Sequence, residues 1–162
     1  MESKTLAPED RIRIPGLWDF EYSYFAGDTA SRFFRILREE GRICGTRCPK
    51  CARVLVPARS YCDACFVATT DWQEVGPEGV LDIFSIVGAQ FPGLPPPPFV
   101  MGYITLDGAD TALLNHVVGV DLSDIDEAAK SLMKRPRVRA QFKEQREGRI
   151  TDFHFQIIDE LA

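Results

Sequence analysis

The chain has 162 residues, with 24 acidic against 19 basic side chains and a formal net charge of −5. This length allows one domain of average size, or a small module joined to a domain of about a hundred residues. No apolar run approaches the roughly 18 residues that a membrane-spanning helix needs, so the composition argues against an integral membrane protein.

Residues 1–27 are expected to form an irregular extension that is rich in aromatic side chains, which follow the turn signal Ile14-Pro15-Gly16. Aromatic side chains are enriched both in protein cores and at interfaces. The extension should therefore pack on its own domain or on a partner subunit. The predicted anchors of a partner interface are Trp18, Phe20 and Tyr24.

A helix is predicted to begin at Gly27-Asp28-Thr29 and to run to Glu40. Apolar residues recur on one stripe, at Ala30, Phe33, Phe34 and Leu37, while arginines lie off that stripe. This spacing indicates an amphipathic helix. Gly41 is expected to end it, because glycine accepts the left-handed backbone conformation that closes many helices.

Four cysteines follow in two Cys-x-x-Cys pairs, Cys48 with Cys51 and Cys62 with Cys65. Two such tight turns can direct four thiolates to one point, which is the closed tetrahedral site that structural zinc prefers. The ten residues between the inner cysteines are long enough for a β-hairpin between the two turns, and the whole predicts a zinc ribbon with one zinc per chain. The alternatives are two disulfides, four buried free cysteines, or iron in a rubredoxin-like electron carrier.

The fifth cysteine, Cys44, has no partner left. It is interpreted as a small buried hydrophobic residue, although Arg42 and Arg47 could lower the pKa of a reactive thiol at this position. An odd thiol in a chain without an apolar signal segment favours a reducing compartment, so the protein is expected in the cytoplasm.

Charge is distributed unevenly along the chain. Residues 1–66 hold eleven Lys/Arg against nine Asp/Glu, or +2, and residues 67–162 hold eight against fifteen, or −7. Two basic runs stand out, Arg32 to Arg59 and Lys130 to Arg149. Basic residues near the ribbon could bind phosphates or could simply balance a zinc–thiolate centre of net charge −2. The candidate phosphate contacts are Arg47, Lys50, Arg53 and Arg59.

The rest of the chain predicts a mainly β domain. After a short strand at Trp72–Val75 and the turn Gly76–Gly79, strands are expected at Val80–Val87, Phe99–Leu106, Thr111–Val120, Arg137–Lys143 and Ile150–Ile158, with turns at Asp107-Gly108 and Glu147-Gly148. One helix, Ser123 to Met133 with Ser123 as its cap, lies between the third and fourth strands. Three strands, a helix and two strands is the order of a five-stranded OB-type barrel. The expected organisation is an extension at 1–27, helix plus ribbon at 28–75 and the OB domain at 76–162.

A proline-rich segment, Phe91 to Phe99, separates the first two barrel strands. Prolines lack the N–H of a strand ladder, so this segment should be a stiff extended loop. It could be a spacer across the barrel mouth, or an ordered apolar lip for a ligand formed by Phe91, Leu94 and Phe99.

Catalytic groups are not evident in the sequence. The two histidines, His116 and His154, each fall within a predicted strand and are interpreted as packed or surface residues. No glycine-rich phosphate-binding loop is present. The chain is therefore not expected to catalyse a reaction alone.

These features together resemble the family of zinc-ribbon plus OB-fold proteins that accompany thiolases. The resemblance spans roughly residues 28 to 158 and rests on the following segments: Gly45 to Cys51, Pro57-Ala58-Arg59, Cys62 to Cys65, Trp72, Gly79 and Pro98-Phe99-Val100. Where the family commonly has a glycine before the fourth strand, this chain has Lys134-Arg135-Pro136.

The resemblance implies an accessory subunit that lies against a thiolase-like catalytic subunit and helps to bind a coenzyme A thioester, with the nucleophilic cysteine supplied by the partner. The alternative is a nucleic-acid-binding module, because ribbons and OB barrels both serve that purpose. A basic barrel face with exposed aromatic residues would be expected in that case, and the net charge of −7 on residues 67–162 argues against it.

Overall fold

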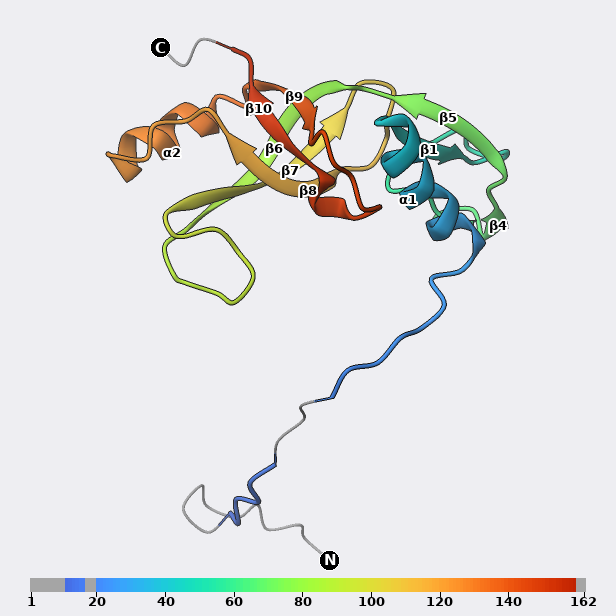
Figure 1. Ribbon diagram of the computed structural model, residues 1–162. Coiled ribbons are helices and arrows are strands. Elements are labelled where there is room, and N and C mark those ends of the chain that lie inside the picture. The colour runs from blue at the N-terminus through green and yellow to red at the C-terminus, as the bar shows by residue number, and fades with distance from the viewer. Residues whose placement is uncertain (1–10, 17–19, 160–162) are drawn as a thin grey trace, which may run out of the picture.

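The computed structural model describes residues 11–16 and 20–159 and consists of a helix, a zinc ribbon and a closed β-barrel (Figure 1). Helix α1 (Asp28–Glu40) precedes the ribbon strands β1 (Ile43–Arg47), β2 (Val54–Leu55), β3 (Tyr61–Cys62), β4 (Val67–Ala68) and β5 (Asp71–Val75). The barrel follows, with β6 (Glu78–Val87), β7 (Phe99–Leu106), β8 (Leu113–Val118), α2 (Ile125–Met133), β9 (Arg137–Phe142), a 3₁₀ turn (Ile150–Asp152) and β10 (Phe153–Ile157).

The barrel strands close in the order β10-β8-β7-β6-β9. Only the β8–β10 pair is parallel, and the others are antiparallel. The first three strands form a meander, and α2 carries the chain to the fourth, as the OB fold requires. The predicted fold class is therefore confirmed.

Alternation along the strands sends one set of side chains into the barrel. In β7 the inward residues Val100, Ile104 and Leu106 are at most 1% exposed, and Gly102 lies so close to Leu81 that a Cβ there would be 2.4 Å from its Cδ1. Helix α2 packs on β6 and buries Ala128 and Leu132, while Ile125 and Met133 stay exposed. The apolar stripe predicted for this helix is thus wider than the face that it buries.

Helix α1 has the predicted bounds and ends at Gly41, whose φ of 62° is left-handed. Its buried residues are Phe33, Ile36 and Leu37, so the predicted stripe omitted Ile36. The guanidinium carbon of Arg32 lies 4.4 Å from the ring centroid of Trp72, a cation–π contact that ties the helix to β5.

Three local predictions were wrong. The segment between the cysteine pairs is not one hairpin, because β2 pairs with β1 and β3 pairs with β4, so that each cysteine pair occupies the turn of its own hairpin. The N-cap of α2 is Asp124, since its carboxylate accepts the Glu127 N–H at 3.0 Å, and not Ser123. The last strand starts at Phe153, because Ile150–Asp152 forms a 3₁₀ turn around the Asp152 side chain.

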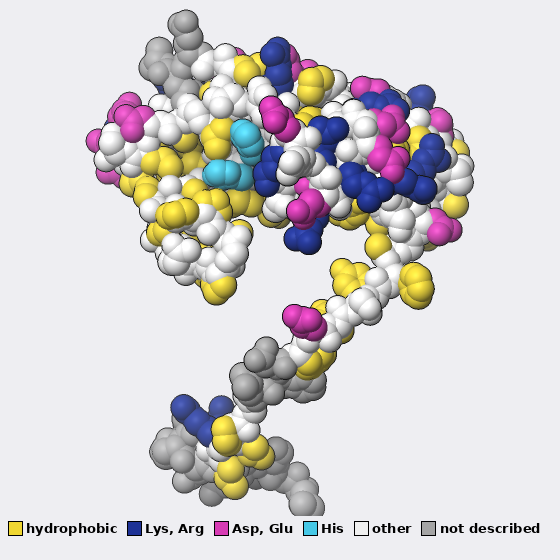
Figure 2. All heavy atoms as spheres, viewed as in Figure 1, with side chains coloured by type: hydrophobic (Ala, Val, Ile, Leu, Met, Phe, Trp, Pro, Cys, Tyr) yellow, Lys and Arg dark blue, Asp and Glu magenta, His cyan; other side chains and the backbone are white. Residues whose placement is uncertain are grey.

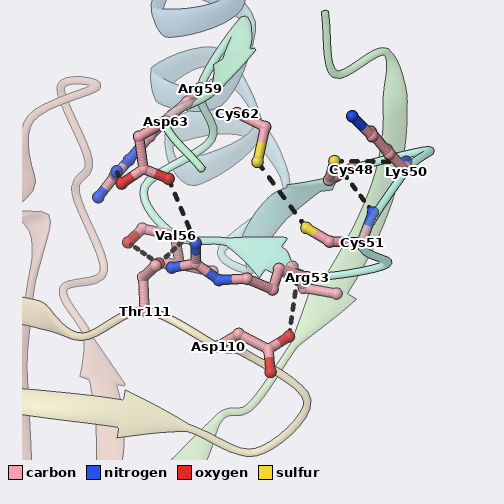
Figure 3. A network of polar contacts seen from close by, with 11 residues as sticks. Cys48, Lys50, Cys51, Arg53, Val56, Arg59, Cys62, Asp63, Asp110 and Thr111 are labelled. Atoms are coloured by element: carbon pink, nitrogen blue, oxygen red, sulfur yellow. Dashed lines mark hydrogen bonds and ion pairs between the residues drawn. The ribbon is translucent and has the colours of Figure 1, made fainter. Parts of the chain in front are cut away.

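The ribbon and the barrel share one hydrophobic core. Phe33 and Leu37 of α1, and Val54 and Val56 of the ribbon, belong to the same buried cluster as the barrel interior. The turn between β7 and β8 also reaches the ribbon. There the Val54 N–H donates to Asp110 Oδ2 at 2.8 Å, and Thr111 Oγ1 accepts the Val56 N–H at 2.7 Å (Figure 3). Backbone groups of β2 are therefore bonded by the barrel.

Neither α1 nor α2, the helices in the described part of the chain, has the length and apolar character needed to cross a membrane.

Candidate functional site

The four paired cysteines meet at one point in the ribbon. Cys48 and Cys51 come from the β1–β2 turn, while Cys62 ends β3 and Cys65 lies in the β3–β4 turn. Their four Sγ atoms lie within 4.8 Å of one another, and Cys51 Sγ is 3.8 Å from Cys62 Sγ (Figure 3). A tetrahedron with metal–sulfur bonds of about 2.3 Å has edges of about 3.8 Å, so the spacing fits zinc.

Backbone donors and the neighbouring thiols shape the acidity of this cluster. The N–H groups of Cys51 and Lys50 point at Cys48 Sγ, at 3.5 and 3.4 Å, and the Cys51 N–H is the largest cause of the fall in the Cys48 pKa to about 6. The pKa of Cys65 is raised to about 12, first by its hydrogen bond with Cys51 and next by burial. Four adjacent thiols cannot all ionise without a cation, and a divalent metal would supply one.

The centre is suited to structure and not to chemistry. Cys48 and Cys62 are 1% and 0% exposed, and four sulfur ligands fill a tetrahedral site, leaving no position for a substrate. Cys44 lies apart from the cluster in β1, buried, and burial raises the pKa of its thiol against the effect of Arg42. It behaves as the buried hydrophobic residue that was expected.

The four candidate phosphate contacts differ in their surroundings. Arg53 and Arg59 share one carboxylate, Asp63, at 3.3 and 3.5 Å (Figure 3). Arg47 and Lys50 are exposed, and neither forms a salt bridge with another described residue. The charge available to an external phosphate is therefore greater at Arg47 and Lys50.

The proline-rich loop does not join these cations. Figure 1 places the loop between β6 and β7 at the far end of the barrel from the ribbon. Phe91 and Leu94 are about half exposed, at 49% and 46%, but Phe99 is 3% exposed because it starts β7 and packs edge-on against the His116 ring. The ribbon cations and this loop therefore do not form one site, and Phe99 is not part of an exposed lip.

A cleft that the sequence did not predict lies under the loop. It has a volume of about 510 Å³ and is lined by Gly93, Leu94, Pro95, Met101, Asn115, His116, Lys143, Thr151, Phe153 and His154. Figure 2 shows the two histidines together on this face, with apolar surface beside them. The sequence held part of the information needed to predict this cleft. The third and fifth strands of an OB barrel, here β8 and β10, are neighbours, and His116 and His154 both occupy outward positions on them.

Two models of one protein family match the chain in succession. They are described as the ChsH2 rubredoxin-like zinc ribbon domain, at residues 37–71, and the ChsH2 C-terminal OB-fold domain, at residues 72–133, and together they span more than half of the chain. The chain belongs to the ChsH2 family. No curated protein sequence matches it significantly.

Two solved structures share the ChsH2-type fold. One is a protein of unknown function from the DUF35 family of Sulfolobus solfataricus, with a TM-score of 0.58 and 23% identity over 82% of this chain and 85% of that one. The other, titled an Ltp2–ChsH2(DUF35) aldolase, has a TM-score of 0.57 and 17% identity over 84% of this chain and 100% of that one. At these identities the likeness shows the fold alone.

The structure describes two of the three predicted interface anchors, Phe20 and Tyr24. Trp18 lies outside the described residues. Phe20 and Tyr24 are 62% and 81% exposed, and Tyr22 lies between them with ring centroids 5.8 and 6.2 Å away. The described part of this extension projects away from α1 (Figure 1).

Proposed function

We propose that this ChsH2-family chain is a noncatalytic accessory subunit of a heteromeric thiolase, an acyl-CoA C-acyltransferase, and that it assists acyl-CoA binding and assembly of the complex. The observation that carries the proposal is a row of exposed apolar side chains on three adjacent barrel strands. Ile83 of β6 pairs with Tyr103 of β7, which pairs with Leu114 of β8, and their exposed fractions are 65%, 46% and 42%. A contiguous apolar surface of this kind marks a protein–protein interface.

Three further observations support the proposal. A solved structure with this fold is an Ltp2–ChsH2(DUF35) aldolase, in which a ChsH2 protein is named together with Ltp2. The aromatic extension offers anchors of the type that dominate interface energetics. Cys44 is the one cysteine outside the metal cluster, and its raised pKa is the opposite of what a thiolase nucleophile needs. The nucleophile would therefore come from the partner.

The zinc centre has a structural role in this proposal. One zinc is held by Cys48, Cys51, Cys62 and Cys65 and fixes the ribbon that presents Arg47 and Lys50. These two cations are the proposed contacts for the phosphates of coenzyme A. Arginine and lysine both bind phosphate oxygens, and within residues 11–16 and 20–159 no carboxylate forms a salt bridge with Arg47 or Lys50. The aromatic extension and overall length also resemble the small subunit of benzoylsuccinyl-CoA thiolase from anaerobic toluene degradation. Benzoylsuccinyl-CoA thiolase is therefore the specific activity that we propose for the complex.

Assembly is tested by co-expression with a thiolase-like candidate subunit, with and without Tyr103→Lys. A lysine in the centre of the apolar row should abolish co-purification, whereas Met133→Lys, at an exposed apolar residue of α2, should not. Deletion of residues 1–27 should weaken assembly and leave the zinc content at one per chain. Undiminished co-purification of the Tyr103→Lys protein would refute the role of the row.

Coenzyme A binding is tested on the assembled complex. Arg47→Ala with Lys50→Ala should raise the KM for acyl-CoA several-fold with little change in kcat, the pattern of lost uniform binding. Lys130→Ala, which removes an exposed cation of α2, is the control. An unchanged KM in the double variant would move the phosphate contacts to the partner.

A further inference from the structure

The cleft under the proline-rich loop is built on the outer face of the barrel. Met101 of β7 lies opposite His116 of β8. The parallel register of β8 and β10, in which Phe155 meets Val117, sets His154 beside His116. Leu94 and Pro95 of the loop line the other side of a space of about 510 Å³. This volume is in the range of small-molecule sites.

Three nitrogen groups, the Lys143 amine and the imidazoles of His116 and His154, line this cleft. Burial lowers the pKa of His154, and the charge of Lys143 lowers it further. Burial also lowers the pKa of His116, and His154 adds to the effect. No carboxylate among the described residues contributes to either shift. Neither histidine ring, nor the Lys143 amine, makes a hydrogen bond to another described residue.

Asp152 is the carboxylate that interacts with Lys143, and no described Asp or Glu lines the cleft itself. The loop at 88–98 contains no ionisable residue, and on β9 the residue opposite His154 is Gln141. In the segment after β9, Glu147 pairs with Arg149, and Arg146 donates to the carbonyl of Arg38. Glu144 of that segment is exposed and does not line the cleft.

The Asp152 carboxylate, whose pKa the charge of Lys143 helps to lower, is held mainly by backbone groups of the preceding turn. Asp152 Oδ2 accepts the backbone N–H groups of Glu147, Gly148 and Arg149, at 3.0, 2.7 and 2.9 Å. The Asn115 side chain is also fully hydrogen-bonded. Its amide nitrogen donates to the carbonyls of Ile150 and Phe153, and its oxygen accepts the backbone N–H of His116. These two side chains fix the walls of the cleft, and the Lys143 amine and both imidazoles keep hydrogen-bonding atoms that no other described residue uses.

We propose that this cleft binds a small amphipathic anion, in which one oxyanion group, carboxylate or phosphate, is attached to a compact apolar body. The oxyanion would meet Lys143, His116 and His154, and the apolar body would lie against Leu94, Pro95 and Met101. An anion in this position favours the protonated imidazoles. The bound anion should raise the pKa values of both histidines. Anion affinity should therefore increase as pH is lowered through the raised pKa values, and should level off below the pKa values of the free protein.

The test uses the full zinc-loaded chain and four probes: phenylacetate, phenyl phosphate, uncharged 2-phenylethanol and inorganic phosphate. Isothermal titration should show either phenyl anion binding at least about tenfold more tightly than 2-phenylethanol, since a charge-assisted contact is worth about that much. The tighter of the two anions identifies the natural oxyanion as carboxylate or phosphate. Inorganic phosphate should bind more weakly than phenyl phosphate, and equal affinity would overturn the apolar half of the proposal.

Variants assign the contacts. Lys143→Gln and His116→Gln should each weaken the preferred anion about tenfold, while Lys130→Gln should not. The imidazole pKa values of His116 and His154, followed by NMR, should rise when the anion is added. Anion affinity that is independent of pH between 5.5 and 8 and unaffected by either variant would overturn the proposal. The inference does not rest on the accessory-subunit role, because the measurement needs no partner, and its failure would leave that role untouched.

Discussion

The zinc ribbon and the OB barrel are held together by different means. Strands β2, β3 and β4 of the ribbon are two residues long, and its separate buried cluster contains only Cys48, Leu55 and Cys62. The barrel strands β6 and β7 are ten and eight residues long and enclose a large apolar interior. The cysteine turns therefore depend on the metal, whereas Val54, Val56 and Val75 hold the rest of the ribbon in the core that it shares with the barrel.

The largest expected effect is therefore the loss of a zinc ligand. Cys62→Ser should remove most of the bound zinc and unfold the ribbon turns, because metal binding and folding of such a site are one free-energy term. The barrel should keep its own strands. Zinc content by elemental analysis, together with amide spectra of the two regions, measures both outcomes.

The matched control is Cys44→Ala, which removes a buried thiol outside the cluster. It should retain one zinc per chain. Full zinc occupancy in the Cys62→Ser protein would show that the four-sulfur assignment is incorrect.

Lowering the pH should also strip the metal. Zinc must displace the proton of Cys65, whose pKa is about 12 in the metal-free cluster, so acid competes with zinc for this thiolate. The barrel carboxylates Glu78 and Asp152 have lowered pKa values and are protonated only in stronger acid, so zinc loss, measured by elemental analysis, should precede any loss of barrel stability.

The barrel should instead respond to a cavity in its interior. Leu132 of α2 is 1% exposed, and its neighbour Met133 is 71% exposed. Leu132→Ala should lower the free energy of unfolding by about 2–5 kcal/mol, whereas Met133→Ala should change it by less than about 0.5 kcal/mol. Urea unfolding measures both, and the zinc content should be unchanged in each. Similar losses in the two variants would mean that Leu132 does not anchor α2 in the core.

Sequence reasoning succeeded where one physical constraint dominates. Two Cys-x-x-Cys turns admit few arrangements besides a common metal site, and the cluster of Cys48, Cys51, Cys62 and Cys65 followed from that spacing. The OB order followed from alternating strands and one helix, and the bounds of β7, Phe99–Leu106, were predicted without error.

It failed where two local solutions were nearly equal in energy. Ser123 and Asp124 are both good helix caps, and only the structure shows which one reaches the Glu127 N–H. The backbone of Val54 and Val56, in and just after β2, is bonded by Asp110 and Thr111, which are more than fifty positions away in the chain. The cleft of His116, His154 and Lys143 likewise depends on how distant strands meet, and no linear spacing encodes it.

The bonds between the two regions can be tested through Thr111. Its hydroxyl accepts the Val56 N–H at 2.7 Å and donates to the Val56 carbonyl at 2.8 Å, and Val56 is fully buried. Thr111→Val should leave both backbone groups unsatisfied and lower the free energy of unfolding by about 1–3 kcal/mol. Thr111→Ser keeps the hydroxyl and should lose much less. If the valine and serine variants unfold at the same denaturant concentration, this contact does not couple the ribbon to the barrel.

The smallest effect is expected on the barrel surface, where Glu78 of β6 accepts from Arg137 and Arg139 of β9. The hydrogen bond from Arg139 is the largest cause of the lowered pKa of Glu78, followed by that from Arg137. A carboxyl with a depressed pKa in the folded state stabilises the fold above its unfolded pKa and loses that contribution as pH falls through the folded value. Arg139→Gln should therefore reduce stability slightly near pH 7 and have no effect once Glu78 is protonated in acid. Both charges are partly exposed, so high salt should also reduce the difference in stability.

The control is Arg149→Gln, whose partner Glu147 lies outside this network. A difference between Arg139→Gln and the unaltered chain that persisted equally at pH 7 and at pH 2.5 would assign the role of Arg139 to packing of its stem and not to its charge.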